Sequence, residues 1–202
     1  MLCFPRGRED TLPKIPQLAM KRNDLDGIPD VPIPEGYTWR TFTEDDEAAW
    51  CEIIEGNIGE GWTADKFELA IFTAPQFDPD GLFLTFLGEE PAGTSCAWRK
   101  SPDEIEEGIL HMLAVKEAHR NRGLGTFLTF KVLEYLRERD FESCFLTTDD
   151  DRLAAVKVYL NLGFEPVYTH ENHPPRWRAV FRRLGLDPAG LPCAAIQGQG
   201  GN

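Results

Sequence analysis

The sequence predicts an α/β domain built on a mixed sheet. From Tyr37 onward, segments with strand and helix periodicity follow one another in the order β-α-α-β-β-β-α-β-α-β-β. The chain has 202 residues, 42% hydrophobic and 11% aromatic, which suffices for one sizeable core. A glycine-rich turn, 120–126, lies between an apolar strand and an apolar helix. These three features favour a single globular domain over a disordered chain.

The predicted domain spans residues 37–184 and is flanked by segments of different composition. Residues 1–36 contain six prolines and little periodicity, so we expect a Pro-rich N-terminal extension there. Residues 185–202 end in a stretch of glycine and glutamine with few apolar side chains, which predicts a flexible C-terminal tail.

In the first part of the domain, 37–42 alternates in polarity and predicts a strand. Thr43 and the acidic residues after it resemble a capping box, which predicts a helix to about Gly56. Thr63 is the expected cap of a second helix. Two apolar runs, 82–87 and 92–98, are separated by a glycine-containing turn and predict a hairpin.

In the second part, 108–115 predicts a strand and 123–139 a helix that is apolar over most of its circumference. A short strand is expected at 143–148. The three aspartates at 149–151 then offer an N-cap for a helix through Leu162, which Gly163 would end. The last two strands are expected at 164–169 and 176–181.

Charge and cysteine usage exclude several function classes. The formal net charge of −13 disfavours nucleic acid and anionic membranes as partners, since both reward basic patches. Five widely spaced cysteines without a Cys-x-x-Cys pair favour a reducing cytoplasm and argue against a zinc site or a disulfide framework. No apolar run approaches the length of a membrane span, and the N-terminus lacks a signal-peptide pattern.

The turn at 120–126 has the chemistry of a phosphate-binding loop. Gly123 and Gly125 let the backbone approach an anion, and the free N–H groups of the next helix point toward it. A nucleotide-binding P-loop would need a lysine after the glycines, and a dinucleotide-binding turn would need a third small residue where Leu128 stands. The pattern therefore predicts a pyrophosphate turn that works without lysine or metal.

Two motifs together resemble the GCN5-related N-acetyltransferase (GNAT) superfamily. The first is Arg120-x-x-Gly123-x-Gly125, directly after an apolar strand. The second is the downstream pattern Ala155-x-x-x-Tyr159-x-x-x-Gly-Phe. The motifs cover residues 108–166, and the remainder agrees in element order only. The resemblance implies the GNAT fold, with a mixed, mostly antiparallel central sheet flanked by helices.

The resemblance also implies acetyl-CoA as co-substrate, with no metal, and direct transfer of acetyl to a primary amine. The implied cofactor-binding residues are Leu113, Ala114, Val115, Arg120, Asn121, Arg122, Gly123, Leu124, Gly125, Thr126 and Arg152. Backbone N–H groups of a bulged strand at 113–115 would stabilise the oxyanion. Arg152 stands where many members have asparagine. Its side chain is expected either to contact a phosphate of CoA or to lie on the surface.

Two catalytic residues are expected. Tyr159 matches the general acid of the family, with a core tyrosine as its alternative. His111-Met-Leu-Ala-Val resembles arylalkylamine N-acetyltransferases, whose histidine there acts through water. Their second histidine is Ile109 here, so His111 is the lone candidate base, and a core histidine is the alternative. Glutamates at 104, 106 and 107 are further candidates.

The sequence leaves the acceptor amine unidentified, and a homodimer remains possible. A non-catalytic acyl-CoA-binding regulatory module of the same fold is the alternative function. The resemblance implies that the segment 58–62, between the first two helices, borders the acceptor site. Gly59 and Gly61 would let it move, and Trp62 would either form a wall for an apolar acceptor or pack as a staple against a helix. The His170-x-x-His173 spacing is compatible with a metal pair, but the two prolines that follow argue against one.

Overall fold

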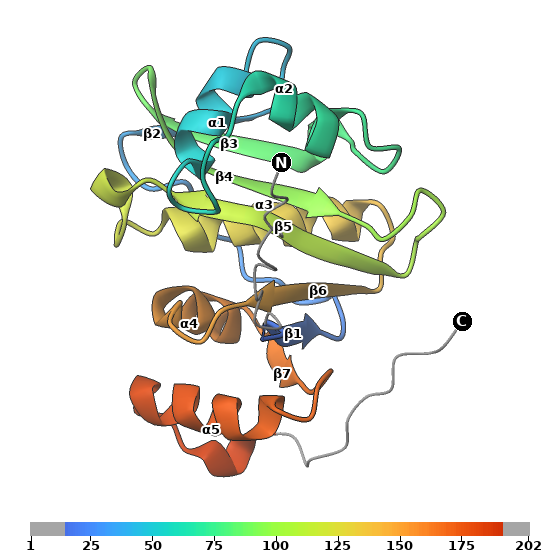
Figure 1. Cartoon of the computed structure of the whole chain (residues 1–202), viewed down its shortest axis with the longest axis vertical. Coiled ribbons are helices and arrows are strands. Elements are labelled where there is room, and N and C mark those ends of the chain that lie inside the picture. Colours follow the sequence, from blue (N-terminus) through green and yellow to red (C-terminus); the bar gives the residue numbers. More distant parts are fainter. Residues whose placement is uncertain (1–14, 192–202) are drawn as a thin grey trace, which may run out of the picture.

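A computed structural model describes residues 15–191, which form one seven-stranded sheet with helices on both faces (Figure 1). The sheet order is β2-β3-β4-β5-β6-β1-β7. The strands are β1 (Leu18–Arg22), β2 (Tyr37–Thr41), β3 (Leu82–Leu87), β4 (Glu90–Trp98), β5 (Glu107–Val115), β6 (Ser143–Thr148) and β7 (Glu165–Val167). Only the β5–β6 pair is parallel, so the expected mixed, mostly antiparallel sheet is confirmed.

Helices flank this sheet on both faces. They are α1 (Glu47–Ile54), α2 (Ala64–Phe67), α3 (Leu124–Glu138), α4 (Leu153–Asn161) and α5 (His173–Leu184). One turn of π-helix, Glu68–Phe72, continues α2. Short 3-10 turns lie at Pro79–Gly81, Glu117–His119 and Pro188–Gly190. In this part of the chain no helix is both long and apolar enough to cross a membrane.

Alternate residues of β4 face the two layers of helices. The Ser95 hydroxyl donates to the carbonyl of Leu128 in α3, at 3.0 Å. The next residue, Cys96, is buried in the cluster that α1 and α2 form with the other face. The strand period of two thus separates a large core under α3, α4 and α5 from a smaller, aromatic-rich core under α1 and α2.

The expected helix ends are largely confirmed. The Thr63 side chain accepts a hydrogen bond from the Lys66 N–H and so caps α2. Gly163 follows α4 with φ +81°, as a C-terminal glycine should. The aspartates 149–151 do not cap α4, because the N-cap position falls on Arg152. The first helix begins at Glu47, later than expected, since the Asp46 carboxylate binds the Arg40 side chain and the Thr43 N–H instead.

Two sequence interpretations are wrong at the β7 end of the sheet. Residues 176–181 are helical and lie in α5, because Trp177, Val180 and Phe181 repeat at helical spacing and all three are buried. The missing strand comes from the other end of the chain: Leu18–Arg22 inserts between β6 and β7 and pairs with both. The segment before Tyr37 is therefore not only an extension, since it supplies a buried strand. Predictions for residues 1–14 and 192–202 fall outside the described residues.

Candidate functional site

The site begins where two strands of the sheet separate. The parallel pairing of β5 with β6 starts at Glu107 and ends at Ile109, although both strands continue. On its other side, β5 bulges against β4: Ala114 pairs with Thr94, but His111 pairs with Cys96. Met112 lies inside this bulge with φ +52°, a left-handed conformation that is uncommon for a residue with a side chain. The bulge lies just before the expected 113–115 segment.

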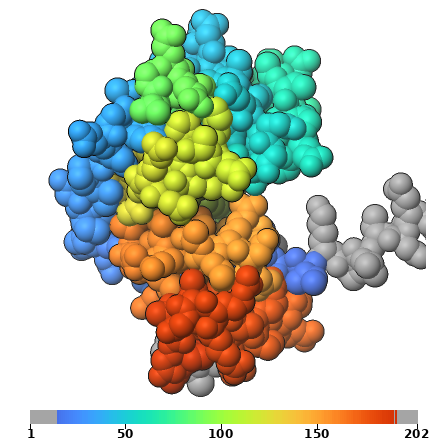
Figure 2. Space-filling view, turned by 90° about the vertical axis from the view of Figure 1, so that its left-hand side faces the viewer, coloured from blue at the N-terminus to red at the C-terminus, as the bar shows by residue number. Residues whose placement is uncertain are grey.

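A cavity of about 320 Å³ occupies this opening. Figure 2 shows the corresponding hollow between the segment after β5 and the α4 region. Its lining comes from both faces of the sheet. The lining residues are Gln17, Ile58, Ile109, Leu110, His111, Met112, Leu113, Phe145, Thr147, Thr148, Arg152 and Tyr159. The fold therefore brings both predicted catalytic side chains, Leu113 and Arg152 to one cavity.

Tyr159 lies on α4 and its side chain is 6% exposed. Burial raises the pKa of its hydroxyl above the ordinary value, so the group stays protonated at neutral pH. The Tyr159 side chain lines the cavity, and within the described residues its hydroxyl has no hydrogen-bond partner. A protonated donor is thus available to a ligand there.

His111 lies opposite, on β5, with its ring 5.4 Å from that of Trp98. Burial lowers the pKa of the imidazole below its ordinary value of 6.5. The ring is therefore neutral at pH 7 and able to accept a proton. Two of the alternative bases are engaged elsewhere: the Glu104 carboxylate accepts from the Glu106 and Glu107 N–H groups, and Glu107 pairs with Lys21 at 2.7 Å. The third, Glu106, is exposed to solvent.

The glycine turn leads into α3 with the geometry that an anion needs. Gly123 has φ +88° and stands at the N-cap, with no side chain satisfying the first turn of the helix. Asn121 also has a positive φ, of +60°. A Cβ on Gly125 would meet no atom within 4 Å, so the space beside this backbone is open. The Leu124 side chain is buried, which leaves only its backbone for a ligand.

The three arginines predicted to contact the cofactor differ in their surroundings. Arg120 donates through Nη2 to the Asn57 side chain, at 2.6 Å, and through Nε to the Val115 carbonyl. Arg122 is exposed on the turn. Arg152 pairs with Asp149 at 3.0 Å and lines the cavity with a partly exposed side chain.

Several lining residues were not foreseen from the sequence. Gln17 reaches the cavity from the segment that leads into β1. Its side-chain oxygen accepts a hydrogen bond from the Thr147 hydroxyl, and its side-chain amide donates one to Asp149, each at 2.9 Å. Ile58 comes from the loop between α1 and α2. Trp62, expected as a cavity wall, packs edge-on against Trp50 at 5.0 Å instead. Only a glycine-rich loop pattern marked this region in advance.

Residues 15–191 hold no cluster of three or more His, Cys, Asp or Glu side chains placed for a metal ion. The rings of His170 and His173 lie 6.0 Å apart, and each Nδ1 accepts a backbone N–H, from Asn172 and Thr169 respectively. The three cysteines in the described range, 51, 96 and 144, are free and buried.

Comparison with known proteins identifies relatives of this arrangement. The model of the acetyltransferase (GNAT) family matches residues 39–164. A mycothiol acetyltransferase from Rhodococcus erythropolis is 33% identical over 172 residues, covering 76% of this chain and 56% of that protein. Another from Streptomyces scabiei is 34% identical over 151 residues, covering 72% and 48%. The chain thus spans about half the length of the curated relatives it matches.

The fold has close counterparts among solved structures. A GCN5-related N-acetyltransferase from Sphaerobacter thermophilus superposes with a TM-score of 0.62 at 24% identity, over 75% of this chain and 49% of that one. A putative GNAT-family acetyltransferase from Novosphingobium aromaticivorans gives 0.54 at 18% identity, over 74% and 58%. At these identities the likeness concerns the fold alone.

Proposed function

This chain belongs to the GNAT acetyltransferase family, and we propose that it moves the acetyl group of acetyl-CoA directly to an amine. The observation that carries the proposal is the cavity between β5 and β6, where a strand bulge, Tyr159 and His111 meet beside a glycine turn. Each of these features supplies one requirement of thioester aminolysis.

The glycine turn would hold the CoA pyrophosphate. Its support is the uncapped start of α3 after Gly123, where free N–H groups and the helix dipole favour an anion. Arg122, exposed on the same turn, adds positive charge, and Arg152 stands at the cavity with α4. Because the chain as a whole carries a net charge of −13, a polyphosphate needs such a local concentration of positive charge to bind.

The bulge would stabilise the transition state. As the amine nitrogen attacks the thioester carbon, negative charge develops on the carbonyl oxygen. The left-handed Met112 interrupts the β4–β5 ladder at this point, and on the other side β6 has already diverged. We infer that backbone N–H groups at Met112 and Leu113, rather than along the whole of 113–115, would donate to the oxyanion, since Ala114 and Val115 pair with β4.

Proton transfers would complete the reaction. The neutral His111 imidazole accepts, through water, the proton that the acceptor's ammonium group must lose before the amine nitrogen can attack. When the tetrahedral intermediate collapses, the C–S bond breaks and the Tyr159 hydroxyl donates its hydrogen to the departing sulfur. The opposite pKa shifts of the two groups fit these roles, since one is kept neutral and basic and the other protonated.

The acceptor would enter from the side of the cavity lined by Ile58, Gln17 and Thr147. The relatives are named mycothiol acetyltransferases, and we extend to this chain an acceptor related to mycothiol. The mixed lining fits such a polar amine, since Gln17 and Thr147 offer hydrogen bonds beside the apolar Ile58.

An acceptor screen tests the proposal. The purified chain is incubated with acetyl-CoA and a panel of small amines, amino sugars, mycothiol precursors and peptides, and acetylated products are detected by mass. Release of CoA thiol is followed in parallel for acceptors without a thiol. At least one amine should be acetylated above the uncatalysed rate. Tight CoA binding by calorimetry without transfer to any amine would instead favour a non-catalytic acyl-CoA-binding module.

A further inference from the structure

The loop between α1 and α2 is held together by its own hydrogen bonds. The Glu55 carboxylate accepts from the Gly61 and Trp62 N–H groups at 3.0 and 2.9 Å. The Trp62 indole N–H donates to the Ile58 carbonyl at 2.7 Å. These bonds join the two ends of the loop to each other and its C-terminal end to its middle, so residues 55–62 form one unit. Ile58, in its middle, is also a wall residue of the cavity.

One side chain links this loop to the glycine turn. Asn57 donates to the Ile53 carbonyl at 2.7 Å, which fixes the amide on α1. Its side-chain oxygen accepts from Arg120 Nη2 at 2.6 Å, across 63 positions of sequence. The neighbour of Asn57 in the chain is Ile58. The Arg120 guanidinium and the cavity wall are therefore linked through two adjacent residues, Asn57 and Ile58.

The helix before the loop is anchored separately. Lys116, just after β5, pairs with Glu52 of α1 at 2.7 Å and with Glu90 at 3.1 Å. Three glycines after α1, at 56, 59 and 61, have positive φ angles between +69° and +78°, where the backbone can rearrange with little steric resistance. Movement of the loop relative to α1 is thus easier than movement of α1 itself.

We propose that the Asn57–Arg120 hydrogen bond couples CoA binding at the glycine turn to the ordering of residues 55–62, and so to the wall that the acceptor meets. The proposal rests on the proposed function, since the anion concerned is the CoA pyrophosphate. Arg120 uses Nε and Nη2 for Val115 and Asn57, and its Nη1 edge remains for a phosphate oxygen. Arg120 is then a positioning residue rather than only a source of charge.

The coupling has a defined sign. When Arg120 Nη1 donates a charge-assisted hydrogen bond to a phosphate oxygen, the planar guanidinium is held in one orientation. In that same orientation Nη2 donates to Asn57. Ordering the Arg120 side chain lowers the entropic cost of its hydrogen bond to Asn57. CoA therefore stabilises the hydrogen-bonded arrangement of the loop described above. By linkage, an acceptor that packs on Ile58 increases CoA affinity by the same factor as CoA increases acceptor affinity.

Hydrogen exchange tests the coupling without knowledge of the acceptor. Amide exchange of peptides covering 55–62 and 120–127 is measured by mass spectrometry in the full chain, with and without saturating CoA. In the wild type, CoA should slow exchange of the loop by about fivefold or more, a typical size for coupled sites. In Asn57→Ala, calorimetry should still detect CoA binding and the turn should still be protected, but the loop should not be.

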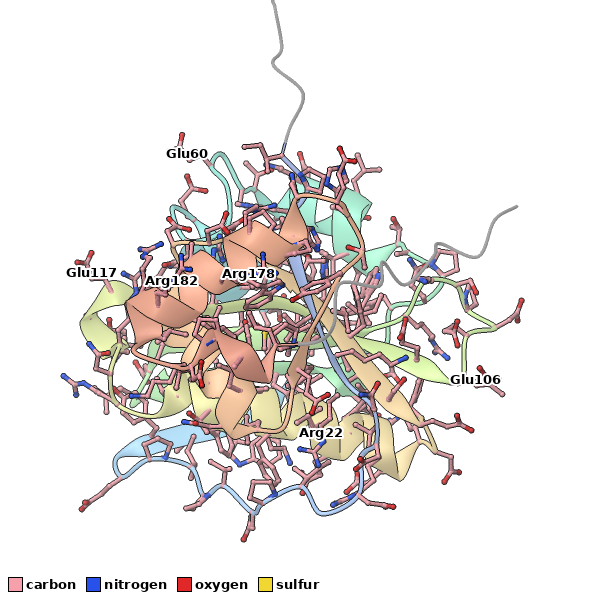
Figure 3. The ribbon with its side chains drawn as sticks, turned by 90° about the horizontal axis from the view of Figure 1, so that it is seen from below. Arg22, Glu60, Glu106, Glu117, Arg178 and Arg182 are labelled. Atoms are coloured by element: carbon pink, nitrogen blue, oxygen red, sulfur yellow. The ribbon has the colours of Figure 1, made fainter. Side chains whose placement is uncertain are left out.

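Two further variants separate coupling from loss of structure. Asn57→Asp keeps an oxygen acceptor for Arg120 and should retain the loop protection. Glu60→Gln changes the same loop at a side chain that points away from the body of the molecule (Figure 3) and should behave as the wild type. Equal protection in Asn57→Ala and wild type, or CoA binding to the wild type without loop protection, overturns the coupling alone. Failure of the wild type to bind CoA overturns the proposed function as well.

Discussion

The two halves of the sheet are assembled in different ways. The half with the bulge and the glycine turn consists of nearly consecutive residues, since β5 leads directly through 116–123 into α3. The other half places β1 between β6 and β7, so residues 18–22 pair with residues more than 120 positions later. The bulge and the glycine turn thus belong to one local motif, whereas the helix that bears Tyr159 is supported by a distant part of the chain.

Arg22 shows how that support is made. Its guanidinium, on a side chain that is almost fully buried, donates to the carbonyl of Leu162 at the end of α4 and to the carbonyls of Asp24 and Asp26, at 2.8 and 2.6 Å. A Cβ on Gly163 would lie 2.6 Å from this guanidinium. β1 therefore fixes the C-terminus of the helix on which Tyr159 stands (Figure 3).

The largest effect is expected at Tyr159, on the helix α4 that the distant segment β1 supports. Tyr159→Phe should lower kcat by about a thousandfold, roughly 4 kcal/mol in activation free energy, because the leaving sulfur loses its proton donor. CoA affinity by calorimetry should hold within about threefold. Tyr135→Phe removes a hydroxyl that bonds Asp78, away from this cavity, and is the control whose kcat should stay at the wild-type level. A fully active Tyr159→Phe would remove the general acid from the mechanism.

The next effect tests the supporting half. Arg22→Met should lower the free energy of unfolding by about 3 kcal/mol, because it keeps the aliphatic stem but leaves several backbone carbonyls without a donor. Urea unfolding measures the change. Arg178→Met on α5 is the matched control: this arginine is exposed, and a change within about 0.5 kcal/mol is expected. Similar values for both variants would mean that β1 is peripheral after all.

Two glycines of the same turn, Gly123 and Gly125, should respond differently to substitution by alanine. Gly123→Ala should lower stability by about 1–2 kcal/mol, because φ +88° is unfavourable for alanine, and it should weaken CoA binding. Gly125→Ala meets open space and should leave the melting temperature unchanged or slightly higher. Thermal unfolding of the two variants side by side decides the point, and equal destabilisation would contradict the conformational argument.

The smallest expected effect is a dependence on pH. Since burial lowers the pKa of His111 below 6.5, kcat/KM should stay high at pH 6.5 and fall only as pH drops through the lowered value. Unfolded chains bind this proton near pH 6.5 and the native state does not. Stability therefore rises with pH between the lowered pKa and 6.5. His111→Gln should remove the acid limb of kcat/KM and weaken the dependence of stability on pH; His173, whose pKa burial also lowers, accounts for what remains. An unchanged acid limb in that variant would assign the base to another group.

Much of the site could be predicted because its residues are close in sequence. The spacing Arg120-x-x-Gly123-x-Gly125 requires a turn before a helix wherever the chain folds, because only glycine adopts φ +88° without strain. The same holds for Tyr159 and Gly163, one helical turn apart. The prediction of a strand at 176–181 is wrong, because Trp177, Val180 and Phe181 follow helical spacing.

The remaining site residues could not be predicted, because they depend on contacts between distant segments. Nothing about Gln17, Asn57 or Ile58 in isolation distinguishes them from surface residues, and their roles arise only when β1 and the α1–α2 loop meet the opening of the sheet. Arg120 belongs to the motif, yet its partner Asn57 is 63 positions away.

The sequence by itself determined the glycine turn and most of the helices and strands, since local backbone preferences and periodicity control these. The two candidate catalytic side chains followed from the family resemblance of the motifs around them. Tertiary structure alone decided that Leu18–Arg22 completes the sheet, that the bulge centres on Met112 and that Asn57 joins the loop to the turn. Strand pairing and apolar burial lower the free energy of the folded state whatever the sequence separation of the partners. The strands that pair with a short apolar segment such as β1 are therefore determined only when the whole core forms.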